Sequence, residues 1–455
     1  MSISPARAAA FDILLRIQQQ SAYASELLHS SQYERLSFAD HGLATELVMG
    51  VMRWRSRLDE ELALYSDKGV AKLDLEVLTA LRLGTYQLRF LDRMPERAAV
   101  YESVELVKRA RKKSAVPFAN AVLRKLASAV GDDIQARNGN RKQDLEIEPN
   151  LSYSPAEMSR RLAHPLWLVE RWIREFGLDR AREICSYDQR APETVVRLTD
   201  SEVEVELKQN GIDLAPGRLL ASARRVRSGN ITATRAFGKG QVAIQDEASQ
   251  LVGLLVGKGQ RILDCCAAPG GKTRILAAQN PGASIVALEL HPHRARLLQK
   301  LVPAKNVEVI QADAREFKAE GAFDRILTDV PCSGTGTLAH NPEIKWRLTP
   351  QDLDELQGRQ LAILQSAMRF AAPGTRLVYS TCSLEREEDE AVVEKALAAE
   401  PSFHALDGRT ELERLRAESE LVWEDIDSLV SGQFVRTIPG IHACDGFFVA
   451  ILGKG

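Results

Sequence analysis

The sequence lacks any long apolar run. None of its 455 residues belongs to a segment that approaches the roughly 20 apolar residues of a membrane span. The N-terminus also lacks the succession of charged, apolar and small-residue regions that marks a secretory signal. These two absences exclude membrane-spanning and secreted proteins, so we expect a cytoplasmic protein without a membrane partner.

Cysteine patterns typical of metal sites and disulfides are absent too. The six cysteines include no C-x-x-C pair and no dense framework, which argues against zinc and against a disulfide-stabilised fold. We therefore expect no metal ion, and the cysteines have to be explained as individual thiols. The chain is nevertheless long enough for about two to four domains.

The two commonest nucleotide-binding fingerprints are missing, although a glycine loop is present. Residues 261–276 predict a strand, a Pro269-Gly270-Gly271 turn and a helix start, the usual place for a nucleotide-like ligand in a doubly wound sheet. The loop is not G-x-G-x-x-G, and G-x-x-x-x-G-K-[ST] fails because its first glycine would fall at Cys266. A loop without a phosphate cradle favours a cofactor without a pyrophosphate, such as S-adenosylmethionine.

Periodicity divides the chain into four segments. Residues 1–130 predict an all-helical domain of about five to seven helices, and the polar residues 131–150 predict a linker. Residues 151–240 predict a small α/β domain that connects or binds RNA, with a short strand at 231–234. In residues 241–455 apolar runs alternate with helical stretches, which is typical of a mainly parallel sheet covered on both faces.

Charge is distributed unevenly along the chain. Residues 1–130 carry 19 Lys and Arg against 15 Asp and Glu, a net +4, whereas residues 241–455 carry 23 against 30, a net −7. The first region includes a dense basic run from Lys108 to Lys113. Such a run is about as often a solvated helix face as a patch for a polyanion. For the second interpretation the candidate RNA-binding residues are Lys108, Arg109, Arg111, Lys112 and Arg124.

Acidic residues end or closely follow three predicted strands. Glu289, Asp313 and Asp329 all do so, and ligands of such sheets bind beyond the carboxyl ends of the strands. Glu289, 18 residues after Gly271, suits a ribose diol, and Asp313 suits an adenine edge. The alternative is that each acid only caps the next helix. Three acids in register with one glycine loop favour a ligand site.

Two cysteines have matching surroundings. Cys332 lies in Asp329-Val-Pro-Cys-Ser-Gly-Thr-Gly336 and Cys382 in Tyr379-Ser-Thr-Cys-Ser383, each after an apolar run. A lone buried cysteine is usually an inert small hydrophobe, but two at one sheet edge suit a reaction that needs a soft nucleophile. A thiol that adds to carbon 6 of cytosine makes carbon 5 able to attack a methyl sulfonium, and a carboxyl group such as Asp329 at ring nitrogen 3 would stabilise the adduct. The surroundings alone do not tell the roles of the two thiols apart.

These motifs resemble those of a known enzyme family. S-adenosylmethionine-dependent RNA cytosine-5 methyltransferases contain, in the same order, motifs similar to those at residues 245–249, 263–273, 329–336, 341–346, 380–383 and 445–448. The helical front, with Ala44-Thr-Glu-Leu-Val48 and Asn120-Ala-Val-Leu-Arg124, resembles the antitermination-factor RNA-binding domain that the bacterial 16S ribosomal RNA enzymes of this family carry. The resemblance covers nearly the whole chain and is looser between residues 130 and 240.

The resemblance implies an α/β, Rossmann-like methyltransferase domain that uses S-adenosylmethionine and acts on 16S ribosomal RNA or a small-subunit assembly intermediate. It implies that Cys382 is the nucleophile, that Cys332 assists release of the covalent adduct, and that Asp329 faces the target base. The implied cofactor-binding residues are Cys266, Ala267, Ala268, Pro269, Gly270, Gly271, Lys272, Glu289, Asp313 and Asp329. Lys272 could instead serve the catalytic pocket.

Two positions depart from the family pattern. Glu289 stands where an Asp is usual, and Ala339-His340 stand where many relatives have two arginines, which bears on a contact with RNA phosphate. Besides methylation of carbon 5 of one cytosine in 16S ribosomal RNA, two functions remain open. One is the same chemistry on transfer RNA. The other is a non-catalytic RNA-binding or ribosome assembly factor, which the presence of both cysteines and a complete glycine loop disfavours.

Overall fold

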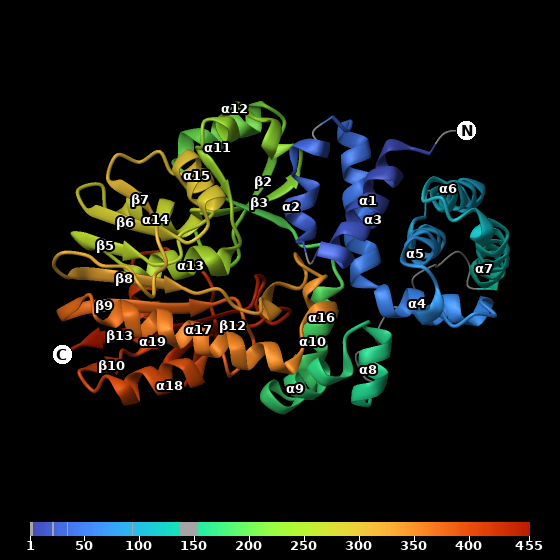
Figure 1. Cartoon of the computed structure of the whole chain (residues 1–455). Helices are drawn as coiled ribbons and strands as arrows, with labels where there is room; N and C mark the ends of the chain where they lie inside the picture. The colour runs from blue at the N-terminus through green and yellow to red at the C-terminus, as the bar shows by residue number, and fades with distance from the viewer. Residues whose placement is uncertain (1–2, 21, 34, 93, 137–152) are drawn as a thin grey trace. The chain divides into compact units, whose positions relative to one another are not determined.

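The computed structural model describes residues 3–20, 22–33, 35–92, 94–136 and 153–455 (Figure 1). The chain divides into two compact units, residues 1–190 with 338–347 and residues 191–337 with 348–455. This division differs from the predicted boundaries. The segment predicted as one small domain, 151–240, is shared: its helices up to residue 190 belong to the first unit, and its strands, with the helices at 201–209 and 235–238, belong to the second.

The first unit is helical within its described residues. Its α-helices are α1 (Pro5–Gln20), α2 (Ala24–Leu28), α3 (Phe38–Arg53), α4 (Arg55–Tyr65), α5 (Leu75–Phe90), α6 (Glu96–Arg109), α7 (Val116–Ala136), α8 (Pro155–Arg161), α9 (Leu166–Phe176), α10 (Leu178–Asp188) and α16 (Ile344–Arg347). Apolar residues at helical spacing bring α1 to α7 onto a common core, in which α5 is buried on nearly every side. The helical prediction for the front of the chain is confirmed.

Helix boundaries in this unit follow local hydrogen bonds. The Ser37 hydroxyl accepts a hydrogen bond from Asp40 N at 3.1 Å and so begins α3. The linker predicted from residue 131 begins later, because α7 continues to Ala136, and residues 137–150 of that prediction lie outside the described part of the chain. No helix among the described residues is both long and apolar enough to cross a membrane.

A small four-stranded sheet opens the second unit. Its elements are β1 (Thr194–Leu198), α11 (Ser201–Gln209), β2 (Asp213–Pro216), β3 (Ala223–Ser228), α12 (Arg235–Gly238) and β4 (Val242–Ile244). The antiparallel order β2-β3-β1-β4 is that of a split β-α-β fold. The strand predicted at 231–234 is wrong, because Ile231–Ala233 form a turn of 3-10 helix. Val196 faces the helices of this sheet, whereas Val195 joins the core of the larger sheet that follows.

The larger sheet has nine strands. They are β5 (Arg261–Asp264), β6 (Ser284–Glu289), β7 (Val307–Gln311), β8 (Phe323–Asp329), β9 (Ala371–Thr381), β10 (Phe403–Ala405), β11 (Val430–Ser431), β12 (Phe434–Thr437) and β13 (Phe447–Lys454). Their order is β11-β12-β13-β9-β8-β5-β6-β7, with β10 against β13. The five strands β5 to β9 run parallel, and β13 pairs antiparallel with β9. The predicted Rossmann-like sheet is confirmed.

Helices cover both faces of this sheet (Figure 1). One face packs against α13 (Glu247–Val256), α14 (Gly271–Gln279), α15 (Pro292–Leu301) and α19 (Gly408–Ala417), and the other against α17 (Pro350–Met368) and α18 (Glu390–Ala399). Consecutive strand residues alternate between the two cores, as Ile262 and Leu263 do. The carboxyl ends of the parallel strands therefore share one edge, from which the site is built.

Candidate active site

The two predicted cysteines lie together at the carboxyl edge of the sheet. Cys382 directly follows β9, and Cys332 lies three residues after β8. Because β8 and β9 are parallel neighbours with Asp329 opposite Ser380, both loops leave the sheet at the same place. Cys332 Sγ and Cys382 Sγ are 3.2 Å apart, and both residues are half-buried.

Cys332 holds its proton firmly. The hydrogen bond with Cys382 and, after it, burial raise the pKa of Cys332 well above that of an ordinary thiol. Its S–H is therefore available as a donor to Cys382 Sγ at neutral pH.

Asp329 lies beside the cysteine loops with both carboxylate oxygens engaged. Its Oδ2 is 2.7 Å from Lys272 Nζ, and its Oδ1 accepts a hydrogen bond from Ser380 Oγ at 2.8 Å. Lys272 belongs to the first turn of α14, and its Nζ lies 5.1 Å from the centre of the Phe447 ring. Lys272 thus contacts a residue that the resemblance assigns both to the cofactor and to the target base.

The glycine loop is shaped by its contacts with α15. Gly270 has a φ of 112°, and a Cβ there would lie 2.5 Å from Val302 Cγ2 and 2.8 Å from Leu298 Cδ1. Only glycine fits this position, and α14 begins at the next residue, Gly271. Backbone N–H groups at the start of a helix suit a ligand with acceptor groups, so the loop fits the adenosyl cofactor predicted from the sequence.

Cys266 begins the predicted cofactor stretch. Burial raises its pKa well above the ordinary value. Its neighbour Ala267 donates its N–H to Leu288 O at 2.9 Å, which ties the stretch to β6. Asp264, at the end of β5, is fully buried, and burial raises its pKa to about 7. Asp264, Cys266 and Ala267 thus lie at the base of the glycine loop, next to β5 and β6.

Glu289 and Asp313 stand at the ends of the next two strands. Glu289 Oε1 accepts a hydrogen bond from His291 N at 2.8 Å, and Asp313 Oδ1 accepts one from Arg315 N at 2.9 Å. The Arg315 guanidinium, 2.5 Å from Asp313 Oδ2, lowers the pKa of that carboxyl group. Each acid thus accepts a hydrogen bond from the backbone N–H two residues further along, but α15 has no side-chain cap and Asp313 is followed by a turn, so neither acid makes the helix-capping contact considered as the alternative.

Three residues that the sequence did not single out join the two cysteine loops: Ser333, Ser383 and Glu388. The Glu388 carboxylate accepts hydrogen bonds from both serine hydroxyls. Backbone contacts add to this link, because Gly336 N donates to Cys382 O at 2.9 Å. No signal in the sequence marks Glu388, which lies in an acidic run that is typical of a solvated surface.

Most of the candidate RNA-binding residues make ion pairs within the first unit. Lys108 pairs with Glu105 at 2.6 Å, Arg109 with Asp12 at 2.6 Å and Lys112 with Asp74 at 3.1 Å. Arg111 and Arg124 are exposed. Exposed ion pairs stabilise a protein by only about 0–1 kcal/mol, so these side chains can exchange their carboxylate partners for phosphates.

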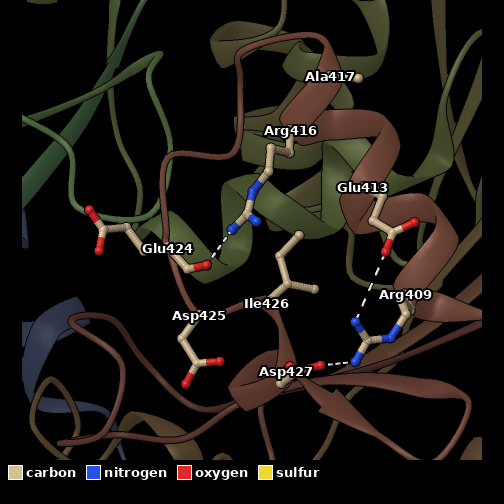
Figure 2. A pocket seen from close by; sticks show the side chains of 8 residues that line it. All are labelled: Arg409, Glu413, Arg416, Ala417, Glu424, Asp425, Ile426 and Asp427. Carbon is tan, nitrogen blue, oxygen red and sulfur yellow. Dashed lines mark hydrogen bonds and ion pairs between the residues drawn. The ribbon is translucent and has the colours of Figure 1, made fainter.

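A surface hollow of about 390 Å³ lies elsewhere in the second unit (Figure 2). It is lined by Arg409, Glu413, Arg416, Ala417, Glu424, Asp425, Ile426 and Asp427. Arg409 pairs with Asp427 and, at 4.0 Å, with Glu413. None of the predicted site residues lines the hollow, and its second arginine, Arg416, donates to the backbone oxygens of Trp423 and Glu424.

The parallel sheet, the glycine loop on its first strand and the acids at the next strand ends define a Rossmann-like, S-adenosylmethionine-dependent methyltransferase. A model described as 16S rRNA methyltransferase RsmB/F matches residues 252–453, and a NusB family model matches residues 4–128. The chain belongs to this family of RsmB/F RNA methyltransferases and carries a NusB-like RNA-binding domain in front.

The alignments with individual relatives cover both units of the chain. The probable ribosomal RNA small subunit methyltransferase B of Bacillus subtilis is 31% identical over 470 residues, which cover 100% of each chain. The ribosomal RNA small subunit methyltransferase B of Pseudomonas putida is 32% identical over 401 residues, covering 84% of this chain and 86% of that protein. A crystal structure of a methyltransferase homolog protein from Pyrococcus horikoshii, 26% identical, matches with a TM-score of 0.55 over 67% of this chain and 100% of its own.

Proposed function

We propose that this RNA methyltransferase modifies carbon 5 of one cytosine in 16S ribosomal RNA through a covalent adduct with Cys382. The observation that carries the proposal is the 3.2 Å separation of Cys332 Sγ and Cys382 Sγ beside Asp329. Two thiols at this distance suit a reaction in which one sulfur must add to a ring carbon and later be expelled. The family description and the names of the relatives support small-subunit ribosomal RNA as the substrate.

The first half of the reaction is addition. Cys382 loses its thiol proton to solvent, and its sulfur forms a bond to carbon 6 of the cytosine while the conjugated electrons of the ring shift by way of carbons 5 and 4 onto ring nitrogen 3. Asp329 faces that nitrogen and is oriented by Lys272 at 2.7 Å. Carbon 5 then attacks the methyl group, which bound S-adenosylmethionine supplies as a sulfonium substituent. An adduct bonded to Cys382 and methylated at carbon 5 results.

The second half is elimination. The carbon 5 proton has to leave, and the bond between carbon 6 and Cys382 Sγ has to break. Cys332, which retains its proton because its pKa is raised, gives that proton to the departing Cys382 sulfur and takes up the carbon 5 proton. The net transfer moves one proton from carbon 5 to Cys382, which restores both thiols. In this order of steps Cys332 assists release of the methylated cytosine and takes no part in the addition of Cys382 to carbon 6.

The target RNA is tested by bisulfite sequencing of ribosomal and transfer RNA from cells with and without the protein. We expect one cytosine of 16S ribosomal RNA to lose its protection in the absence of the protein. Loss at a transfer RNA position would identify the alternative substrate. Unchanged protection in both RNAs would leave only a non-catalytic assembly factor.

The roles of the thiols are tested by two substitutions. Cys382→Ala should abolish methyl transfer, because no sulfur remains to add to carbon 6. Cys332→Ala should permit addition but slow elimination, so that protein accumulates on RNA as an adduct resistant to denaturation. Gel analysis of enzyme, cofactor and target RNA under denaturing conditions measures this adduct. An adduct formed by Cys382→Ala instead would exchange the two roles.

The other predicted features belong to the same proposal. Glu289 and Asp313 would contact the ribose and adenine of the cofactor, and the glycine loop its methionine part. The basic side chains of the first unit would bind RNA phosphates. A cytoplasmic location, where ribosomal RNA and its assembly intermediates occur in bacteria, is part of the prediction.

A further inference from the structure

Glu388 is a fully buried acid between β9 and α18. Its Oε1 accepts hydrogen bonds from Ser333 N and from Gln360 Nε2, both at 2.8 Å. Its Oε2 accepts from Ser383 Oγ at 2.5 Å and from Ser333 Oγ. Ser333 follows Cys332 and Ser383 follows Cys382, so one carboxylate group binds the residue next to each thiol.

All four donors to this carboxylate are neutral groups. A buried carboxylate is costly unless hydrogen bonds replace its hydration, and four donors supply that replacement. A carboxylate only accepts, so it fixes both serine hydroxyls as donors toward it. A Gln side chain of the same shape has one oxygen and one NH2 group, and it cannot accept at both ends.

The neighbouring Asp389 holds the other side of Cys382. Its Oδ1 accepts a hydrogen bond from Thr381 Oγ1 at 2.5 Å, and Arg436 Nη1 lies 3.0 Å from its Oδ2. The residues before and after Cys382 are therefore bound by two consecutive buried acids. Of these two acids Glu388 also reaches the loop of Cys332, where it adds to the contacts of Thr335 Oγ1 with Leu384 N at 2.9 Å and of Ser333 Oγ with Ser383 Oγ at 3.2 Å.

We propose that Glu388 is a positioning residue that holds the two cysteine loops together, so that Cys332 reaches the sulfur of the Cys382 adduct. The inference rests on the proposed function, because it holds that the elimination step needs the short distance between Cys332 Sγ and Cys382 Sγ. Addition needs Cys382 alone, whereas elimination needs both sulfurs at hydrogen-bonding distance. Loss of the link should accordingly slow release much more than addition.

The test compares full-length Glu388→Gln, Cys332→Ala and wild-type protein on the target RNA. We measure single-turnover methyl transfer, steady-state turnover and the fraction of protein held in a denaturation-resistant adduct. For Glu388→Gln we expect turnover to fall about 100-fold, as for a misplacement of about 1 Å. Single-turnover transfer should fall less than ~10-fold, with an adduct accumulating as in Cys332→Ala. Glu394→Gln, which removes an exposed acid of α18, is the matched control and should behave as wild type.

A second variant tests the same link in case Glu388→Gln does not fold. Ser333→Ala removes one hydroxyl donor and leaves the carboxylate and the Cys382 loop intact, so it should give a weaker form of the same adduct accumulation. Cofactor binding, measured by calorimetry, reports the folded fraction of every variant. A general structural role would lower all rates in proportion to that fraction without adduct.

The outcomes separate the two proposals. Accumulated adduct in Glu388→Gln and Ser333→Ala supports the positioning role. Adduct in Cys332→Ala but in neither of these variants overturns the role of Glu388 and leaves the proposed function standing. Absence of adduct in Cys332→Ala as well overturns the proposed elimination step and the inference that rests on it.

Discussion

Lys345 offers a pH-dependent test of the first unit. It lies on α16, its side chain is 1% exposed, and its Nζ lies 5.2 Å from the centre of the Trp346 ring. Burial lowers its pKa from 10.5 to about 7, and Arg53 acts in the same direction. Asp188 and Cys185 oppose this shift, but burial outweighs them. A cation is thus held in a poorly solvated place.

The size of the effect follows from the pKa difference. A change from 10.5 to about 7 corresponds to roughly 5 kcal/mol of penalty on the charged form, and relaxation of the surroundings reduces what is observed. We expect Lys345→Met, which keeps the length and removes the charge, to stabilise the first unit by about 1–4 kcal/mol at pH 6. His164, whose pKa Lys345 helps to lower, would then pair more readily with Asp188 at 3.2 Å.

The sign of the pH dependence is set by proton uptake. The folded pKa lies below that of the unfolded chain, so between pH 7 and 10.5 the folded state binds fewer protons. Wild-type stability should therefore rise with pH through this window, and the advantage of Lys345→Met should be full below pH 7 and vanish near pH 10.5.

The assay is urea unfolding of both proteins at pH 6 and pH 9.5, with tryptophan fluorescence as the signal. Trp172 is buried in the same unit and packs against His164, so it reports on this region. Lys113→Met, at an exposed position of the same unit, is the control and should show no such difference. An equal effect of Lys345→Met at both pH values would refute the reasoning.

Three further predictions concern the site and its RNA. Gly270→Ala should destabilise the second unit by about 1–3 kcal/mol and weaken cofactor binding in calorimetry, whereas Gly282→Ala, with open space around its Cβ, should do neither. Lys272→Met should lower kcat about 100-fold while cofactor affinity changes little, since Lys272 contacts Asp329; a change confined to cofactor affinity would place it in the cofactor site instead. Removal of the positive charges of the candidate RNA-binding residues together should weaken RNA binding and flatten its salt dependence. An unchanged salt slope would indicate a solvated helix face instead. The residues to substitute are Lys108, Arg109, Arg111, Lys112 and Arg124.

The carboxyl edge of the sheet could be predicted because it depends on local patterns. Apolar runs identify the parallel strands, and parallel strands end at one edge, so Glu289, Asp329 and Cys382 had to be near one another. The segment at 231–234 was mistaken for a strand because β-branched residues favour strands on average. There Thr234 Oγ1 donates to Ile231 O at 2.7 Å and accepts from Phe237 N at 3.2 Å, which stabilises a turn instead.

The direct contact of the two thiols could not be predicted, because it joins segments about 50 residues apart. Glu388 was hidden for a similar reason. Acidic residues in a run are usually exposed, and the hydroxyl groups that make its burial tolerable come from two other loops. The pairing of neighbouring strands can be predicted from the pattern of apolar residues. The hydrogen-bond partners of a buried carboxylate can be identified only from the folded structure.

The charge distribution has a consequence for how RNA is bound. The net −7 of residues 241–455 opposes the approach of a polyanion, whereas residues 1–130 carry a net +4. Under the proposed function we therefore expect affinity for the phosphate backbone to come mainly from the helical domain, and the catalytic domain to act on a base that has left its stack. In this arrangement the catalytic residues do not also have to bind RNA phosphates. Of the two acids at the cysteine loops, Glu388 accepts hydrogen bonds from neutral donors and Asp329 pairs with Lys272.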